Sequence, residues 1–156
     1  FAAMQKLMST LGNWQFPHVE VRLLVTIQIL NALDLTEIFN WYWALDGAKN
    51  RPNKISIVWS FLEWPKCLSL GILPREAKSL ILSRVEQALE KTPPDELGEF
   101  KSHSLKELAA KLKYIFTLWT DEPAPLSDFV SYVDALDSLS GRSWRRTFPE
   151  LRNIVE

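Results

Sequence analysis

The sequence predicts an α/β fold in which two neighbouring parallel strands are followed by a layer of helices. Residues 19–30 alternate apolar and other side chains with a period of two, and they include the stiff β-branched run Val25, Thr26 and Ile27. Residues 54–61 repeat this alternation. Between the two runs, apolar residues recur at helical spacing, and the order strand, helix, strand favours a parallel pair joined by a right-handed crossover.

The first half of the chain therefore contains four predicted elements. Residues 1–11 carry apolar side chains on one face of a helix, which Gly12 ends, and the strand over 19–30 follows. After a corner, residues 35–46 form the second helix, which Asp34 caps with Glu37 as its reciprocal partner. A turn-rich loop then leads to the strand over 54–61.

The second half is predicted to be helical. Residues 62–73 are expected to be irregular, and Pro74 opens a helix that Thr92 and its two following prolines end. A polar linker over 92–103 then precedes a helix with a capping box from Ser104 to Glu107.

The C-terminal segment is predicted to contain one more helix and a tail. The helix spans roughly 126–139 and stops at Gly141. The tail mixes arginines with large apolar side chains between Arg142 and Arg152. This cluster could bind phosphate or a carboxylate, but its apolar content favours a docking tail with a charged rim.

The amino-acid composition limits the partners and sites that we expect for this chain. The apolar share is 47%, the charged share 24% and the net charge −1, so no nucleic-acid or membrane partner is implied. No apolar run approaches the roughly 20 residues of a membrane span. Cys67 is the single cysteine, and the two histidines lie far apart, so we expect neither a disulfide framework nor a metal site. This composition fits a reducing, cytoplasmic setting.

The best candidate ligand-binding residues are Thr26, Gln28 and Asn31. They lie on the first strand and at its C-terminal corner, where parallel α/β folds place ligands. Gln28 and Asn31 offer donors and acceptors that suit a neutral edge such as a nucleobase or ribose. Asn31 could instead satisfy the backbone of the corner. The polar row of this strand could likewise face either a ligand-filled lumen or solvent.

Other polar residues are weaker candidates. Cys67 lies in a loop and could be a nucleophile, although a lone loop cysteine more often has no such role. Glu20 and Glu63 could be general acids if they were buried. No residue is assigned a catalytic role from these patterns.

Three short motifs follow one another along the chain. The first strand matches the pattern V-T-x-Q-x-x-N-A-L, the loop after the second strand matches P-x-Y-L-S-L-x-x-L-P, and the tail matches W-x-x-T-F-P-E-L. The loop departs from its pattern at Cys67. The matching residues are Val25, Thr26, Gln28, Asn31, Ala32, Leu33 and Ile38, then Pro65, Leu68, Ser69, Leu70, Leu73 and Pro74, then Trp144, Thr147, Phe148, Pro149, Glu150 and Leu151.

In this order, the three motifs resemble the C-terminal part of twitch/SPASM-type radical S-adenosylmethionine proteins. This resemblance implies the last third to half of a partial (β/α)6, TIM-like barrel. Residues 1–91 would form the barrel part and residues 92–156 a helical C-terminal extension. Thr26, Gln28 and Asn31 would line the cavity for S-adenosylmethionine or the substrate. The family also carries a Cys-x3-Cys-x2-Cys loop that binds a [4Fe–4S] cluster. That loop is absent here, so the chain by itself would not be a catalytically complete enzyme.

Two hypotheses follow. The leading one is the C-terminal portion of a radical S-adenosylmethionine enzyme, with its reaction and substrate undetermined. The alternative is a non-catalytic, mostly helical protein-interaction domain. Because two strands alone leave exposed edges, we expect residues 1–70 to pack against an N-terminal barrel half or a partner protein outside these 156 residues.

Overall fold

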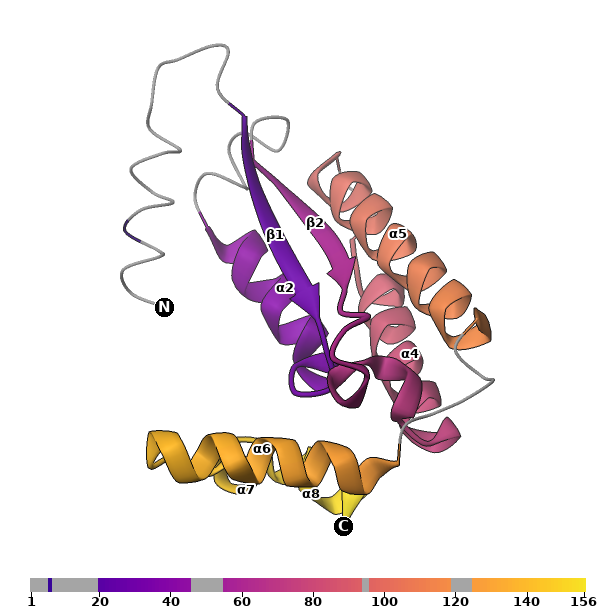
Figure 1. Ribbon diagram of the computed structural model, residues 1–156. Coiled ribbons are helices and arrows are strands. Elements are labelled where there is room, and N and C mark those ends of the chain that lie inside the picture. Colours follow the sequence, from indigo (N-terminus) through magenta and orange to yellow (C-terminus); the bar gives the residue numbers. More distant parts are fainter. Residues whose placement is uncertain (1–5, 7–19, 46–54, 94–95, 119–124) are drawn as a thin grey trace.

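The computed structural model describes Lys6 and residues 20–45, 55–93, 96–118 and 125–156 (Figure 1). The predicted helix over 1–11 and the predicted loop after residue 46 lie outside these residues, apart from Lys6. The elements are β1 (Val21–Ile27), η1 (Ala32–Asp34), α2 (Leu35–Ala44), β2 (Ile55–Phe61), η2 (Lys66–Leu68), η3 (Leu70–Ile72), α4 (Arg75–Glu90), α5 (Glu96–Leu118), α6 (Leu126–Ser140), α7 (Trp144–Thr147) and α8 (Pro149–Val155). The three η elements are short 3-10 turns.

The two strands are parallel neighbours, as predicted. They pair in register from Val21 opposite Ile55 to Ile27 opposite Phe61. Within the described residues the sheet has these two strands. The mixed α/β class and the parallel pair are thus confirmed.

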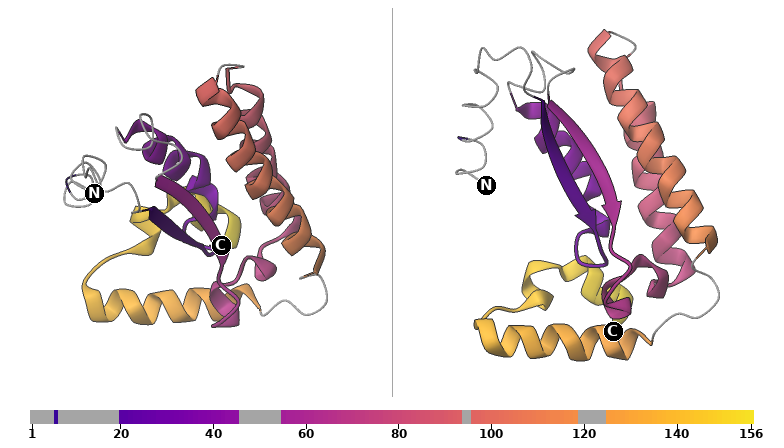
Figure 2. Two further views of the ribbon diagram at one scale, coloured as in Figure 1. Left: turned by 90° about the horizontal axis from the view of Figure 1, so that it is seen from above. Right: turned by 45° about the horizontal axis from the view of Figure 1, so that its top comes forward.

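Helices cover one face of this sheet. Burial alternates along β1, where Val21, Leu23 and Val25 are half-buried while Arg22 and Leu24 are exposed. In Figure 1 the strands lie in front of α2, and the two views of Figure 2 place α4 and α5 beside β2. The opposite face of the sheet is not covered by any described helix. We call it the open face.

The core lies between the covered face and the helices. Phe39, Tyr42 and Trp43 of α2 are buried, and the rings of Tyr42 and Trp43 meet edge to face with centroids 5.2 Å apart. Trp59 of β2 joins the same cluster. Burial of each large side chain contributes about 1.5–3 kcal/mol to folding. α4 and α5 add Ile81, Val85, Leu105, Leu108 and Leu112 to this core. The 3-10 turns and the C-terminal helices add further buried residues, among them Leu70, Phe129 and Leu151.

The predicted linker over 92–103 is wrong, because α5 already begins at Glu96. Ser104 therefore lies inside a helix, and the capping box predicted from it does not form. Early turns of α5 are held by the packing of Leu105 in the core and by the Lys101 ammonium, which lies 5.6 Å from the centroid of the Trp43 ring. These tertiary contacts offset the helix-breaking tendency of Gly98, about 1 kcal/mol.

Two other predicted helix starts need correction. Asp34 makes no side-chain capping bond. It is the last residue of the 3-10 turn η1, which runs directly into α2, so Asp34 has φ −104° and ψ 13° instead of extended backbone. Pro74 has ψ 156° and precedes α4, which begins at Arg75. The predicted irregular loop over 62–73 contains two 3-10 turns, and the Ser69 hydroxyl accepts a hydrogen bond from the Gly71 amide at 3.2 Å.

The C-terminal helices pack below the carboxyl ends of the strands (Figure 2). α6 contacts η2, and it ends as predicted at Gly141, which adopts left-handed backbone with φ 66°. Arg84 of α4 attaches α8 to the rest of the molecule, because its guanidinium donates to the Leu33 carbonyl and to the Glu150 carboxylate, each at 3.0 Å. None of the helices in the described part of the chain combines the length and the apolar character needed to cross a membrane.

Candidate functional site at the open face of the sheet

The segments that follow the two strands lie side by side. The Leu62 amide donates to the Ile27 carbonyl at 2.9 Å, and the Ile29 amide donates to the Leu68 carbonyl at 3.0 Å. The first bond extends the strand pairing by one step, and the second ties the β1 corner to η2. The carboxyl ends of β1 and β2 therefore form one edge, as expected for a βαβ unit.

Asn31 holds the corner after β1. Its side-chain Oδ1 accepts from the Gln28 amide at 2.9 Å, and its Nδ2 donates to the Thr26 carbonyl at 3.0 Å. Both functional atoms of this amide are thereby used on the backbone of the corner. Of the two roles left open by the sequence, this geometry favours the structural one.

Thr26 and Gln28 are placed differently from Asn31. Thr26 is exposed on the open face and lies in register with Ser60 of β2, so the two hydroxyl side chains are neighbours. Gln28 follows the strand, is half-buried and lies at the carboxyl edge. The structure thus brings two of the three predicted residues to one edge together with Ser60.

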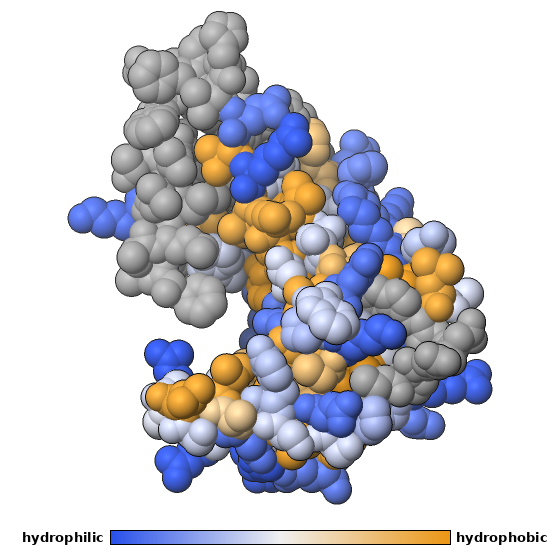
Figure 3. Space-filling model, viewed as in Figure 1, coloured by the Kyte–Doolittle hydropathy of each residue, from blue (hydrophilic) through white to orange (hydrophobic). Residues whose placement is uncertain are grey.

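The rest of the open face is mixed in character. Leu24 is 64% exposed and is paired in register with Val58, which gives an apolar patch in the middle of the face (Figure 3). Arg22 forms an exposed ion pair with Glu20 at 3.3 Å, where solvent screening makes the interaction weak. Hydroxyl and amide groups beside an apolar patch suit a neutral polar ligand that also has an apolar surface.

Ser60 was not identified as a site residue from the sequence, because Ser60 lies beside Thr26 only through the register of the two strands. Its position on the polar row of residues 54–61 was the available signal. Trp64 was also missed as a site residue: it is 76% exposed in the loop after β2 and joined to Pro65 by a cis peptide bond. A large exposed aromatic at the carboxyl edge can stack on a flat ligand.

The remaining predicted candidates lie in or near the same loop. Glu63 is exposed, so its carboxylate is solvated. Cys67 is half-buried in η2 and is a free thiol. The described residues contain no group of three or more His, Cys, Asp or Glu side chains that could hold a metal ion. Since three thiolates are needed, the residues present do not fit a [4Fe–4S] cluster.

One arginine of the C-terminal tail, Arg145, is engaged within the protein, while Arg142 and Arg146 are exposed. Arg145 donates to both carboxylate oxygens of Asp134 and, at 2.5 Å, to Glu156. Its guanidinium carbon lies 4.7 Å from the centroid of the Trp144 ring. Hydrogen bonds from Arg145 and then from Trp144 hold the pKa of Asp134 below its ordinary value. Trp144 and Leu151 are buried, which favours the docking interpretation over a phosphate site.

The open face and its carboxyl edge are accordingly the candidate site. It is assembled from Thr26 of β1, Gln28 just after this strand, Ser60 of β2 and the loop that carries Trp64. Comparison with protein-family models, with curated proteins and with solved structures finds no match to this chain.

Proposed function

We propose that this chain is the C-terminal portion of a radical S-adenosylmethionine enzyme and that its open face lines the cofactor or substrate cavity. One observation carries the proposal: a parallel βαβ pair has helices on one face and a row of hydroxyl, amide and apolar side chains on the other. The two strands and their helices would form the last part of a partial barrel, whose lumen faces the side without helices.

The side chains of this face suit part of S-adenosylmethionine. Thr26, Gln28 and Ser60 offer neutral donors and acceptors for the ribose and base, and Trp64 offers a stacking surface. Asn31 would act indirectly, because it fixes the backbone between Thr26 and Gln28. In this family S-adenosylmethionine supplies the radical that starts the reaction. The ligands of the iron–sulfur cluster would have to come from outside these 156 residues.

The first test is genetic and biochemical. We would read the coding frame upstream of the codon for Phe1 and look for a Cys-x3-Cys-x2-Cys motif. The product of the complete frame would then be purified without oxygen and assayed for iron and for reductive cleavage of S-adenosylmethionine. The proposal expects the motif, bound iron and cleavage. A frame that begins at or near Phe1, or a product that binds no iron, would contradict it.

A matched pair of variants tests the role of this chain. Gln28→Ala removes an amide at the carboxyl edge, and Gln87→Ala removes an amide from an exposed position on α4. We expect Gln28→Ala to weaken binding of S-adenosylmethionine by roughly ten-fold, the effect of one well-placed hydrogen bond, and Gln87→Ala to leave it unchanged. Equal affinities in the two variants would argue against the open face as the binding surface.

A second candidate function is supported by one surface of α6. Tyr132, Leu136 and Leu139 are 39%, 45% and 86% exposed, and their spacing of four and three residues places them on one side of the helix. Hydrophobic surface gathers at the C-terminal end of α6 at the lower left of Figure 3. Such a stripe can insert into the groove of a partner protein, as the interaction-domain alternative requires.

Site-directed photo-crosslinking distinguishes this alternative. A crosslinker at position 136 should capture one defined protein in the source cells, and capture should be lost with Leu139→Ser. A crosslinker at Ala110, an exposed position of α5, serves as the control. Equal capture from both positions would contradict a docking role for the α6 stripe.

A further inference from the structure

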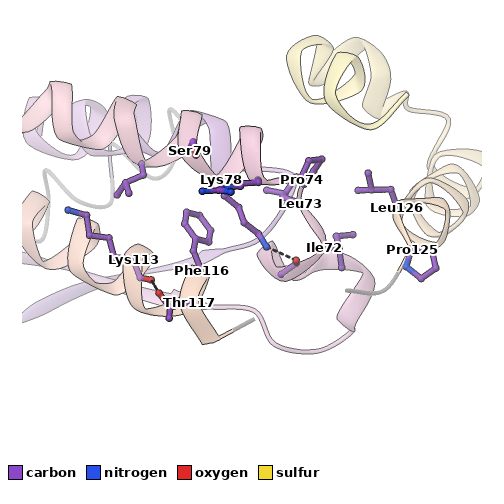
Figure 4. A pocket seen from close by; sticks show the side chains of 13 residues that line it. Ile72, Leu73, Pro74, Lys78, Ser79, Lys113, Phe116, Thr117, Pro125 and Leu126 are labelled. Atoms are coloured by element: carbon purple, nitrogen blue, oxygen red, sulfur yellow. Dashed lines mark hydrogen bonds between the residues drawn. The ribbon is translucent and has the colours of Figure 1, made fainter. Parts of the chain in front are cut away.

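A pocket lies away from the open face, on the helical side of the molecule. It has a volume of about 870 Å³ and lies where η3, the start of α4, the end of α5 and the start of α6 come together (Figure 4). Pockets that bind small molecules commonly have volumes of about 300–1,000 Å³. The residues that line this pocket include none of those on the open face.

One part of the lining is apolar. Phe116 of α5 points toward α4, and Leu126 at the start of α6 lies across the pocket from it (Figure 4). Leu82 of α4 and Ile72 of η3 complete this part. An aliphatic body placed against these side chains would lose part of its contact with water, which is the main favourable term for ligands of this kind.

The other part of the lining is cationic. Among the described lining residues there are three cations, Arg75, Lys78 and Lys113, and no carboxylate. Lys113 is paired with Glu86 at 2.8 Å, while Arg75 is exposed in the first turn of α4. The pocket therefore favours a ligand with a negative charge.

Lys78 is placed to receive that charge. It is half-buried, and its ammonium donates to the Gly71 carbonyl at 2.8 Å (Figure 4). An ammonium has three N–H donors, so this bond uses one of them. Burial also lowers the pKa of Lys78. An anion beside it would compensate the desolvation of this cation.

We propose that this pocket binds an amphipathic carboxylate, a ligand with one anionic head and an aliphatic body. The carboxylate is received by Lys78 and Arg75, and the aliphatic body lies against Leu82, Phe116 and Leu126. This site is separate from the cavity proposed at the open face, and it does not depend on the radical S-adenosylmethionine proposal.

Calorimetric titration with four probes tests the proposed chemistry. Decanoate, kept below its micellar concentration, has both the head and the tail. Decanol lacks the charge, acetate lacks the tail and decylammonium reverses the charge. We expect decanoate to bind to the purified protein at least ten-fold more tightly than each of the others, since a charge-assisted hydrogen bond contributes about that factor.

Variants then assign the binding to this pocket. Lys78→Met keeps the aliphatic stem and removes the charge, so it should weaken decanoate binding roughly ten-fold and leave decanol binding unchanged. Arg75→Gln, at an exposed position, should act in the same direction without affecting folding. Lys106→Met removes an exposed charge elsewhere on α5 and should change neither affinity.

Three results would overturn the proposal. They are no measurable binding of decanoate, equal binding of decanoate and decanol, and equal decanoate affinity in Lys78→Met and Lys106→Met. Circular dichroism and thermal unfolding of each variant separate a lost site from a lost fold. If Lys78→Met does not fold, Arg75→Gln decides the outcome.

Discussion

Replacement of Asn31 by alanine should destabilise the protein by removing two hydrogen bonds from the corner after β1. The bond from the Gln28 amide, 2.9 Å long, is half-buried, and the bond to the Thr26 carbonyl, 3.0 Å long, is exposed. A hydrogen bond contributes about 0.5–1.5 kcal/mol net, and the exposed one lies at the lower end. We therefore expect Asn31→Ala to lower the free energy of unfolding by about 1–2 kcal/mol.

Asn31→Asp separates the two bonds. The carboxylate can still accept from the Gln28 amide, but it offers no donor to the Thr26 carbonyl, so about half of the loss is expected. Asn40→Ala is the matched control, because Asn40 is exposed on α2 and its replacement should change stability by less than about 0.5 kcal/mol.

Urea denaturation followed by tryptophan fluorescence measures these differences. The midpoint should shift while the slope stays constant, because the surface exposed on unfolding is unchanged. If Asn31→Ala is as stable as Asn40→Ala, the corner does not depend on this side chain. Loss of ligand binding at unchanged stability would instead assign Asn31 to the ligand site.

Three further predictions concern other parts of the fold. Gly141→Ala should cost about 1 kcal/mol in thermal unfolding, because Gly141 has φ 66° and the added Cβ meets no atom within 4 Å, so the cost is conformational. Burial raises the pKa of Tyr42 to about 12 from its ordinary value of 10.0. The protonated Tyr42 side chain therefore contributes to stability below pH 10, and this contribution is lost as the pH rises toward 12. In urea denaturation at alkaline pH, Tyr42→Phe should not show this loss of stability. A hydrogen bond from Arg145 and, to a lesser extent, one from Trp144 hold the pKa of Asp134 below 3.8. The Asp134 carboxylate therefore contributes to the stability of the fold above pH 3.8, and this contribution is lost as the pH falls further. Asp134→Asn should make the near-ultraviolet dichroism of Trp144 less dependent on pH in acid.

The strands were predictable because their pattern is local. Alternation in residues 19–30 and 54–61 matches the alternating burial of β1 and the parallel register with β2. Gly141 was equally predictable, since left-handed backbone at a helix end strongly favours glycine.

The start of α5 was not predictable from local pattern. Gly98 and the prolines before it indicate a linker, but contacts of Leu105 and Lys101 with the core extend the helix to Glu96. Such contacts join residues that are far apart in the sequence, so the helix propensity of a short segment does not predict them.

The candidate site was predictable only in part. Thr26 and Gln28 could be chosen because strand ends are where parallel folds bind ligands. Ser60 lies beside Thr26 because of the strand register, which the sequence does not give. The choice between the two roles of Asn31 depends on the geometry of its side chain. The pocket near Lys78 combines three separate stretches of the chain, 71–82, 113–117 and 125–126, so no single stretch of sequence indicates it.

Thiol labelling at position 24 tests whether the open face lines the cavity for S-adenosylmethionine. Leu24→Cys, in a Cys67→Ser background, places a thiol in the middle of the open face, and Leu139→Cys places one on α6 as the control. In the product of the complete reading frame, mass spectrometry of the labelled peptides separates these two positions from other cysteines. We expect S-adenosylmethionine to slow labelling at position 24 and to leave labelling at position 139 unchanged. Labelling at position 24 that is fast and independent of S-adenosylmethionine would show that the open face faces solvent, and it would refute the proposed cavity.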